Sequence, residues 1–201
     1  MSTDAEPRWR RLEPDARREQ IFTCARRLFR ERPYSAVSTA DIAQAAGVAR
    51  GLVNHYFGTK RNLYLQVIKR MMFIPEEWAE TLPDGPVEVR VQIGLTQFLD
   101  RISRHSKAWL SMSGAAGVGH DPDVEEILAE ADQTGASRIM EMIGADKDNP
   151  QARAMILAFV GLTKAAGREW LAKESLTREQ VQLLLEQSLL TIVRTVLPTL
   201  K

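Results

Sequence analysis

The side chains best suited to chemistry stand close together in the segment GVARGLVNHYFGTK, residues 47–60. Arg50, Asn54, His55 and Tyr56 fall within about two helical turns, Lys60 follows them, and no acidic residue interrupts the segment. An arginine can form two hydrogen bonds to guanine and an asparagine two to adenine, while a lysine amine can pair with a phosphate. These residue types therefore favour contact with DNA over catalysis.

Two short helices are predicted to position these side chains. The segment Ser38-Thr39-Ala40-Asp41 resembles a capping box, in which Ser38 accepts a backbone N–H and Asp41 favours the positive end of the helix. Gly47 can take the left-handed conformation that ends this first helix, and a second helix is expected from about residue 49 to 56. Two short helices joined by about three residues including a glycine form a helix-turn-helix, whose second helix lies in the major groove.

The second helix must then have one apolar face and one face toward DNA. Val53 and Phe57, four residues apart, fit the buried face. Gly51 would let the backbone approach the duplex, and an exposed Leu52 can touch a thymine methyl. Lys60 starts the next helix, with Thr59 as its expected N-cap, where a phosphate would meet an amine and free N–H groups. Each residue alone could be ordinary helix surface; together the predicted DNA contacts are Ser38, Thr39, Arg50, Gly51, Leu52, Asn54, His55, Tyr56 and Lys60.

Residues 17–64, above all STADIAQAAGVARGLVNHYFGTKRNLY, resemble the N-terminal domain of the tetracycline-repressor (TetR) family of bacterial transcriptional regulators. Matching positions are Ile42-Ala43, Ala46-Gly47-Val48, Gly51, His55-Tyr56-Phe57, Lys60 and Leu63. Two positions depart from the family pattern. Ala49 stands where Ser or Thr usually caps the second helix, a loss of about 1 kcal/mol of helix stability. Asn54 stands where an aromatic residue commonly precedes His-Tyr, which suggests a different operator. The resemblance implies a homodimer and repression from a palindromic operator that a small organic effector relieves.

The charge distribution supports a polyanionic partner. Residues 1–72 hold 14 Lys and Arg against 7 Asp and Glu, and residues 73–201 hold 13 against 19, although the whole chain has a formal net charge of +1. A basic part on a mildly acidic body is expected when one part meets a polyanion. An uneven solvated surface is the alternative explanation.

Composition indicates an ordinary globular protein. The chain has 201 residues, of which 44% are apolar and 26% charged. No apolar run approaches the roughly 18 residues of a membrane span, and the first residues are too polar for a secretory signal. Cys24 is the only cysteine, which excludes an internal disulfide and suits a reducing cytoplasm. We expect a bacterial cytoplasmic protein that does not interact with membranes.

The fold class expected from the whole sequence is all-α. A helix-turn-helix domain is predicted over residues 15–72, and a larger helical domain for effector binding and dimerisation over residues 73–201. Helices are expected over about 15–32, 59–72, 87–112, 121–143, 150–173 and 177–197, and no stretch alternates with the period of two that a strand requires. Pro75, Pro83, Gly85 and Pro86 mark the break between the domains.

The last two predicted helices are apolar on more than one face. Such helices are buried on more than one side, and pairing with a second copy of the chain would provide this. A core formed within one chain is the alternative. The residues predicted at the dimer interface are Phe159, Leu162, Ala166, Val181, Leu185, Ser188 and Ile192.

Large apolar side chains on separate helices of the second domain could converge on one cavity. An apolar or mildly polar organic compound is the corresponding effector. The residues predicted to bind it are Phe98, Trp109, Met112, Met140, Phe159, Thr163 and Trp170, with Arg168 and His105 as further polar candidates.

No catalytic or cofactor motif is recognised. The segment His120-Asp121-Pro122-Asp123 lacks the helical spacing of metal ligands and fits a helix start better. There is no glycine-rich phosphate loop and no nucleophile elbow. We therefore expect no enzyme activity, no metal and no cofactor. A helical small-molecule-binding protein or a structural dimer without DNA function would leave the basic N-terminal part unexplained.

Overall fold

The computed structural model describes residues 13–74, 78, 81–106, 109–110 and 121–200. Every regular element within these residues is a helix, which confirms the predicted fold class. The chain forms two compact units, which meet in sequence between Val67 and Ile68. This point lies inside helix α4 (Lys60–Met72), whereas the predicted division follows the helix. No helix in the described part of the chain is both long and apolar enough to cross a bilayer.

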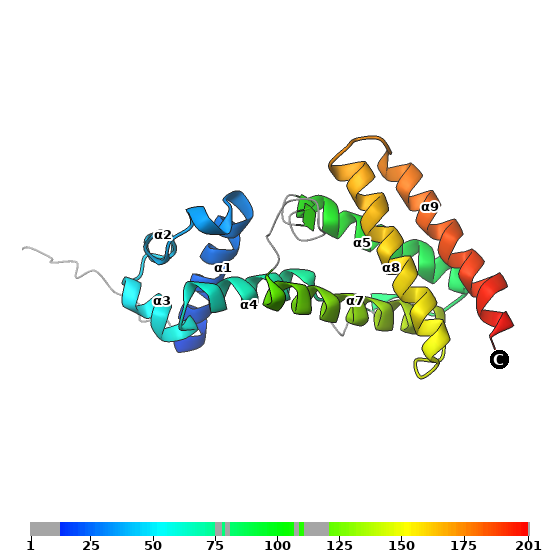
Figure 1. The fold of residues 1–201 in the computed structure, drawn as a ribbon, viewed down its shortest axis with the longest axis horizontal. Coiled ribbons are helices and arrows are strands. Elements are labelled where there is room, and N and C mark those ends of the chain that lie inside the picture. Colours follow the sequence, from blue (N-terminus) through cyan, green and yellow to red (C-terminus); the bar gives the residue numbers. More distant parts are fainter. Residues whose placement is uncertain (1–12, 75–77, 79–80, 107–108, 111–120, 201) are drawn as a thin grey trace, which may run out of the picture. The chain divides into compact units, whose positions relative to one another are not determined.

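The N-terminal unit contains α1 (Pro14–Glu31), the 3-10 turn η1 (Tyr34–Ala36), α2 (Thr39–Ala45), α3 (Arg50–Phe57) and the start of α4 (Figure 1). Pro14 occupies the first turn of α1, where its missing N–H costs no hydrogen bond. Thr59 caps α4 as predicted, since its hydroxyl accepts from the backbone N–H of Asn62 at 3.1 Å. The core of this unit consists of Ile21, Phe22, Ala25, Leu28, Val37, Ile42, Ala43, Ala46, Val53, Phe57, Leu63 and Val67.

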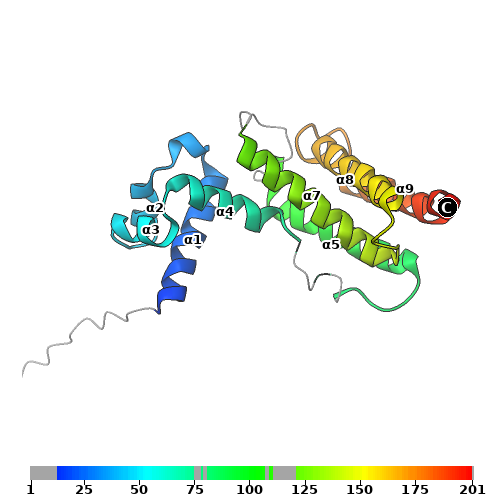
Figure 2. The ribbon, with the colours of Figure 1, turned by 60° about the horizontal axis from the view of Figure 1, so that its bottom comes forward.

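The C-terminal unit is built from four long helices, α5 (Val87–Arg104), α7 (Pro122–Ile143), α8 (Pro150–Leu171) and α9 (Arg178–Thr191). Helix α5 contacts α7 and α9, and α8 contacts the same two helices, so the four close into a ring. Helices α8 and α9 run side by side (Figures 1 and 2).

Local capping explains where these helices begin. Side chains of Asp121, Asn149 and Thr177 accept backbone N–H groups at the starts of α7, α8 and α9, and Thr177 forms a complete capping box with Gln180. Gly144, with φ of 70°, ends α7 in the left-handed conformation.

Two helices differ from the prediction at their ends. Helix α5 ends at Arg104 instead of continuing to Met112, which lies outside the described residues. The final helix leaves α-helical geometry after Thr191 and continues as a π segment, η3 (Ile192–Val196), and a 3-10 turn, η4 (Leu197–Thr199). Pro198 has no N–H to donate and its ring crowds the preceding turn, so a regular helix cannot run through it.

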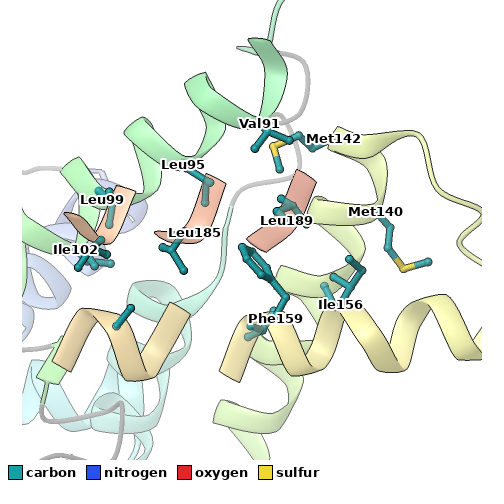
Figure 3. Packing of buried hydrophobic residues seen from close by; sticks show 14 of the residues in the cluster. Val91, Leu95, Leu99, Ile102, Met140, Met142, Ile156, Phe159, Leu185 and Leu189 are labelled. Atoms are coloured by element: carbon teal, nitrogen blue, oxygen red, sulfur yellow. The ribbon is translucent and has the colours of Figure 1, made fainter. Parts of the chain in front are cut away.

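The apolar core of the C-terminal unit lies inside the ring of helices. Figure 3 shows Leu185 and Leu189 of α9 between Leu95 of α5 and Phe159 of α8. All four side chains are buried within one chain. The face of α9 that carries Leu185 and Leu189 is therefore covered by helices of the same chain, which is the alternative to burial between two copies.

Candidate functional site

The start of α2 is a capping box, as predicted. The backbone N–H and the hydroxyl of Ser38 both donate to Asp41 Oδ2 at 2.8 Å, and the Asp41 N–H donates to Ser38 Oγ at 3.0 Å. These hydrogen bonds, the backbone one first, hold the pKa of the Asp41 carboxyl below its ordinary value. Gly47, with φ of 61°, follows α2 and allows the tight turn into α3.

Helix α3 has the two faces that the sequence predicted. Val53 and Phe57 are buried at 2% and 4% exposure. Arg50, Gly51, Leu52, Asn54 and His55 are exposed, and Tyr56 is half-buried. Ala49 precedes the helix without a side-chain cap, and the helix starts at Arg50. The exposed face thus presents one cation, one amide and one imidazole, a set able to bond to base edges.

Two predicted contact residues from different helices meet. Arg50 Nε donates to Thr39 Oγ1 at 3.1 Å, which joins the first turns of α3 and α2. Because this bond uses Nε, the fork formed by the two terminal nitrogens stays available for the paired acceptors of a guanine. Thr39 therefore orients the arginine. Contact of any of these residues with DNA stays a prediction.

Lys60 has a structural role that the sequence did not reveal. Its amine donates to the carbonyl oxygens of Tyr34 at 3.0 Å and Val37 at 2.9 Å, and it lies 3.9 Å from the centroid of the Tyr34 ring. A lysine amine has three donors, so one remains for a phosphate. Lys60 thus connects the start of α4 to the segment before α2 through hydrogen bonds and is not only a free surface cation.

We expect Lys60→Met to lower the free energy of unfolding of the N-terminal unit by about 1–2 kcal/mol, because two charge-assisted hydrogen bonds and a cation–π contact are lost. Thermal unfolding followed by circular dichroism measures this change. Arg26→Met, at an exposed position of the same unit, removes the same charge and serves as the control. An unchanged melting curve combined with weaker DNA binding would assign the amine to phosphate alone.

The C-terminal unit contains a cavity of about 480 Å³ next to the end of α4. Apolar side chains from four helices form most of its wall, and a few polar groups interrupt them. Its lining includes Met71, Met72, Ile74, Trp78, Leu95, Phe98, Trp109, Leu128, Ile139, Met142, Phe159, Val160 and Thr163. Such a site accepts an organic molecule with a substantial apolar part.

Four of the predicted ligand-binding residues lie in the wall of this cavity, namely Phe98, Trp109, Phe159 and Thr163. Met140 and Trp170 do not line it, and Met112 lies outside the described residues. Helical phase explains why Met140 does not line the cavity. Helix α7 lines the cavity along one face at helical spacing, whereas Met140 is rotated away from this face into the core. The residues of this face are Leu128, Ala131, Asp132, Gly135, Ile139 and Met142.

Sequence reasoning missed the charged residues of the cavity, Arg101, Arg104, Asp132 and Lys164. A signal was present for one of them, because Arg101 follows Phe98 by three residues and so shares its face of α5. Asp132 and Lys164 pair across α7 and α8 at 2.6 Å. Lysine and aspartate are ordinarily surface residues, and nothing in the sequence indicates this pairing.

Two glycines make room for the aromatic wall. A methyl group at Gly94 would lie 3.1 Å from the Trp78 ring and 2.5 Å from Met142 Sδ. One at Gly167 would lie 2.3 Å from the Trp109 ring. Both tryptophans therefore pack directly on glycine backbone, one on α5 and the other on α8.

Most of the residues predicted at the dimer interface are covered within the single chain, and the contact between two copies stays a prediction. Phe159, Ala166, Val181 and Leu185 are all buried in the core of the single chain. Leu162, Ser188 and Ile192 are only partly exposed. The large apolar side chains that α9 does expose are Leu183 at 60% and Leu184 at 41%. The apolar periodicity thus corresponds to burial, and for the four buried residues this burial is within one chain.

The described residues contain no group of three or more His, Cys, Asp or Glu side chains placed to hold a metal ion. His120, from the segment considered as a metal site, lies outside them. Asp121 instead accepts the backbone N–H of Asp123 at 3.1 Å and caps α7.

A helix-turn-helix unit joined to a helical unit with an apolar cavity defines a DNA-binding transcriptional regulator. Family models agree over both units. The model of the bacterial regulatory proteins of the tetR family matches residues 21–67, and that of the tetracyclin repressor-like C-terminal domain matches residues 87–192. The chain belongs to the TetR family of bacterial transcriptional regulators.

Individual relatives are distant. The HTH-type transcriptional activator FasR of Mycolicibacterium smegmatis is 25% identical over 170 residues, which cover 82% of this chain and 76% of FasR. A TetR-family regulator from Streptomyces coelicolor superposes with a TM-score of 0.72 at 22% identity, covering 93% of this chain and 90% of that one. FadR of Thermus thermophilus, solved in complex with lauroyl-CoA, gives a TM-score of 0.62 at 22% identity, covering 89% of this chain and 94% of that one.

Proposed function

We propose that this chain is a homodimeric repressor of the bacterial cytoplasm that leaves a palindromic operator when a molecule with a long apolar chain enters the cavity. The observation that carries the proposal is the position of the cavity. Its wall includes Met71 and Met72, the last residues of α4, and α4 is the helix that continues along the chain into the helix-turn-helix unit. A ligand that changes the end of α4 can therefore change the DNA-binding unit.

The apolar wall supports an acyl-type ligand. The FadR protein of similar fold was solved with lauroyl-CoA, a ligand with a twelve-carbon chain. A ligand releases DNA only if it binds more tightly to a state that binds the operator poorly. A roughly 100-fold loss of operator affinity requires about 2.7 kcal/mol of such differential binding, which is within the usual range for coupled sites.

The proposed dimer uses the exposed faces of α8 and α9. Leu183 and Leu184 are the exposed leucines of α9, and Ala158 and Gly161 are exposed small residues of the neighbouring α8. Small residues allow a second pair of helices to approach closely while the leucines supply apolar area. Two helix-turn-helix units are needed because a palindromic site presents two half-sites about one helical turn of DNA, roughly 34–36 Å, apart.

The operator is found by selecting bound duplexes from a random pool, and tryptophan fluorescence and operator binding are then followed together during titration with lauroyl-CoA. We expect fluorescence to change, since Trp78 and Trp109 line the cavity, and operator affinity to fall. Operator binding should itself weaken steeply with added salt, because counterions are released from DNA. A ligand that binds tightly yet leaves operator affinity unchanged would contradict the proposed coupling.

A variant tests whether the cavity is the ligand site. Gly135 is buried in its wall, and a methyl group there meets nothing within 4 Å. We expect Gly135→Leu to weaken acyl ligand binding by roughly tenfold or more, because the side chain fills ligand volume, while the helix is stabilised by loss of glycine. Gly135→Ala gains the same helix propensity with one methyl group and is the matched control. Wild-type affinity in Gly135→Leu would place the ligand elsewhere.

A further inference from the structure

One arginine of the cavity wall is bonded directly to the end of α4. Arg101 of α5 donates from Nη2 to the carbonyl oxygen of Phe73 at 2.8 Å and to that of Met71 at 3.3 Å. The last carbonyls of a helix have no partner within the helix, and a cation near them also interacts favourably with the helix dipole. Arg101 therefore fastens the C-terminal end of α4 to α5.

Arg101 also carries a charge that no described residue of the cavity wall neutralises. Of the described charged residues in the wall, Asp132 is paired with Lys164, which leaves Arg101 and Arg104. Neither arginine forms an ion pair with any residue that the structure describes. Burial, and next the charge of Arg104, lower the pKa of Arg101, although an arginine stays protonated at neutral pH. An apolar cavity with uncompensated positive charge favours an anionic guest.

We propose that Arg101 is a ligand-operated latch: the cavity takes an amphiphile whose anionic, two-oxygen head group, such as a carboxylate, binds the guanidinium of Arg101 and displaces the carbonyls of Met71 and Phe73. This inference rests on the proposed function of the cavity. It adds the chemistry of the ligand head and the atoms through which the ligand reaches α4.

The geometry of a guanidinium makes the two sets of bonds compete. A carboxylate binds an arginine at two points, either through Nη1 with Nη2 or through Nε with Nη2. Both forks use Nη2, the nitrogen that donates to the carbonyl oxygens of Met71 and Phe73 at the end of α4. A two-point anion therefore competes with these two carbonyls for Nη2. It wins the exchange because hydrogen bonds between two charged groups are stronger than those to a neutral carbonyl.

An uncharged head group has no such effect. An alcohol can accept a single hydrogen from Nη1 or Nε and leave both carbonyl bonds in place. The latch thus distinguishes an anionic amphiphile from a neutral one of equal chain length. When the latch opens, the last carbonyls of α4 lose their donor and the final turn of the helix frays.

The test compares sodium dodecanoate with 1-dodecanol on the full chain, using tryptophan fluorescence for affinity and amide hydrogen exchange of residues 69–74 for the latch. We expect dodecanoate to bind roughly tenfold more tightly than dodecanol and to speed exchange in this segment. Dodecanol should bind without changing the exchange. Equal affinities with equal exchange would overturn the latch, whereas binding of neither probe would contradict the proposed function instead.

Three variants separate the latch from simple charge attraction. Arg101→Met should bring the two affinities to about the same value and make exchange fast without any ligand. Arg101→Lys keeps the charge but lacks the fork, so it should keep part of the preference for dodecanoate. Arg104→Met removes a neighbouring charge from the same wall, but Arg104 Nε donates to the backbone carbonyl oxygen of Asp100 within its own helix and not to α4. It should lower the affinity for dodecanoate yet keep the change in exchange.

Melting curves confirm that each variant is folded before it is compared. If dodecanoate no longer changed the exchange in Arg104→Met but still changed it in Arg101→Met, Arg101 would not be the residue that holds the end of α4. Retention of both the preference and slow exchange in Arg101→Met would overturn the proposal outright.

Discussion

Leu185→Glu is expected to unfold the C-terminal unit, whereas Leu184→Glu is expected to give a folded monomer. The two leucines are adjacent in α9 but differ completely in environment. Leu185 is fully buried in the intramolecular core, and Leu184 is 41% exposed. An unpaired carboxylate in an apolar core costs several kcal/mol, a large part of the stability of an ordinary domain. A carboxylate at position 184 stays hydrated in a monomer and loses water only in the proposed contact between two copies.

Circular dichroism and sedimentation velocity distinguish the two outcomes. Leu185→Glu should lose helical signal or precipitate, and Leu184→Glu should keep the signal while its sedimentation coefficient falls to that of one chain. Leu184→Gln, which adds a polar group of similar size without charge, is the matched control and should weaken the dimer less. A dimeric Leu184→Glu would show that this face of α9 is not the contact between copies.

The same pair of leucines shows what the sequence could not provide. Apolar periodicity predicts that a helix face is covered, but it does not say what covers it. Leu185, Val181 and Ala166 were expected between two copies, and the structure covers them with helices of the same chain. Only the packing of α5 against α9 and of α7 against α8 resolves this, and such contacts join residues far apart in sequence.

Features that depend on a few neighbouring residues could be predicted better than long-range packing. The start of α2 at Ser38, the turn at Gly47 and the two faces of α3 were all predicted, because each depends on a few neighbouring residues. The hydrogen bonds of the Lys60 amine within the unit could not be predicted, because its acceptors, the carbonyls of Tyr34 and Val37, are more than twenty residues away in the sequence. Large apolar residues in the sequence predicted part of the cavity wall. Arg101 could not be predicted there, because a single arginine in a sequence usually lies at the surface.

Asn54→Ala is the second change expected to have a large effect, this time on DNA recognition without loss of fold. Asn54 lies in the middle of α3 on its exposed face. Alanine is a better helix former than asparagine, so the helix itself should not weaken. An asparagine that forms two hydrogen bonds to an adenine contributes about 1–3 kcal/mol of discrimination against other bases. We therefore expect operator affinity to fall by roughly 5- to 150-fold and preference to relax at one base pair in each half-site.

The decisive measurement is the ratio of operator affinity to random-duplex affinity, determined at a fixed salt concentration because phosphate contacts make every affinity salt-dependent. Asn54→Ala should lower the affinity for the operator and leave the affinity for a random duplex close to its original value. Asn62→Ala makes the same chemical change at an exposed position in the first turn of α4, outside the recognition helix, and should leave the ratio unchanged. If Asn54→Ala lowered both affinities equally, Asn54 would contact the DNA backbone and not a base. Arg50, whose terminal nitrogens remain available beside Thr39, would then be the residue expected to recognise the base sequence.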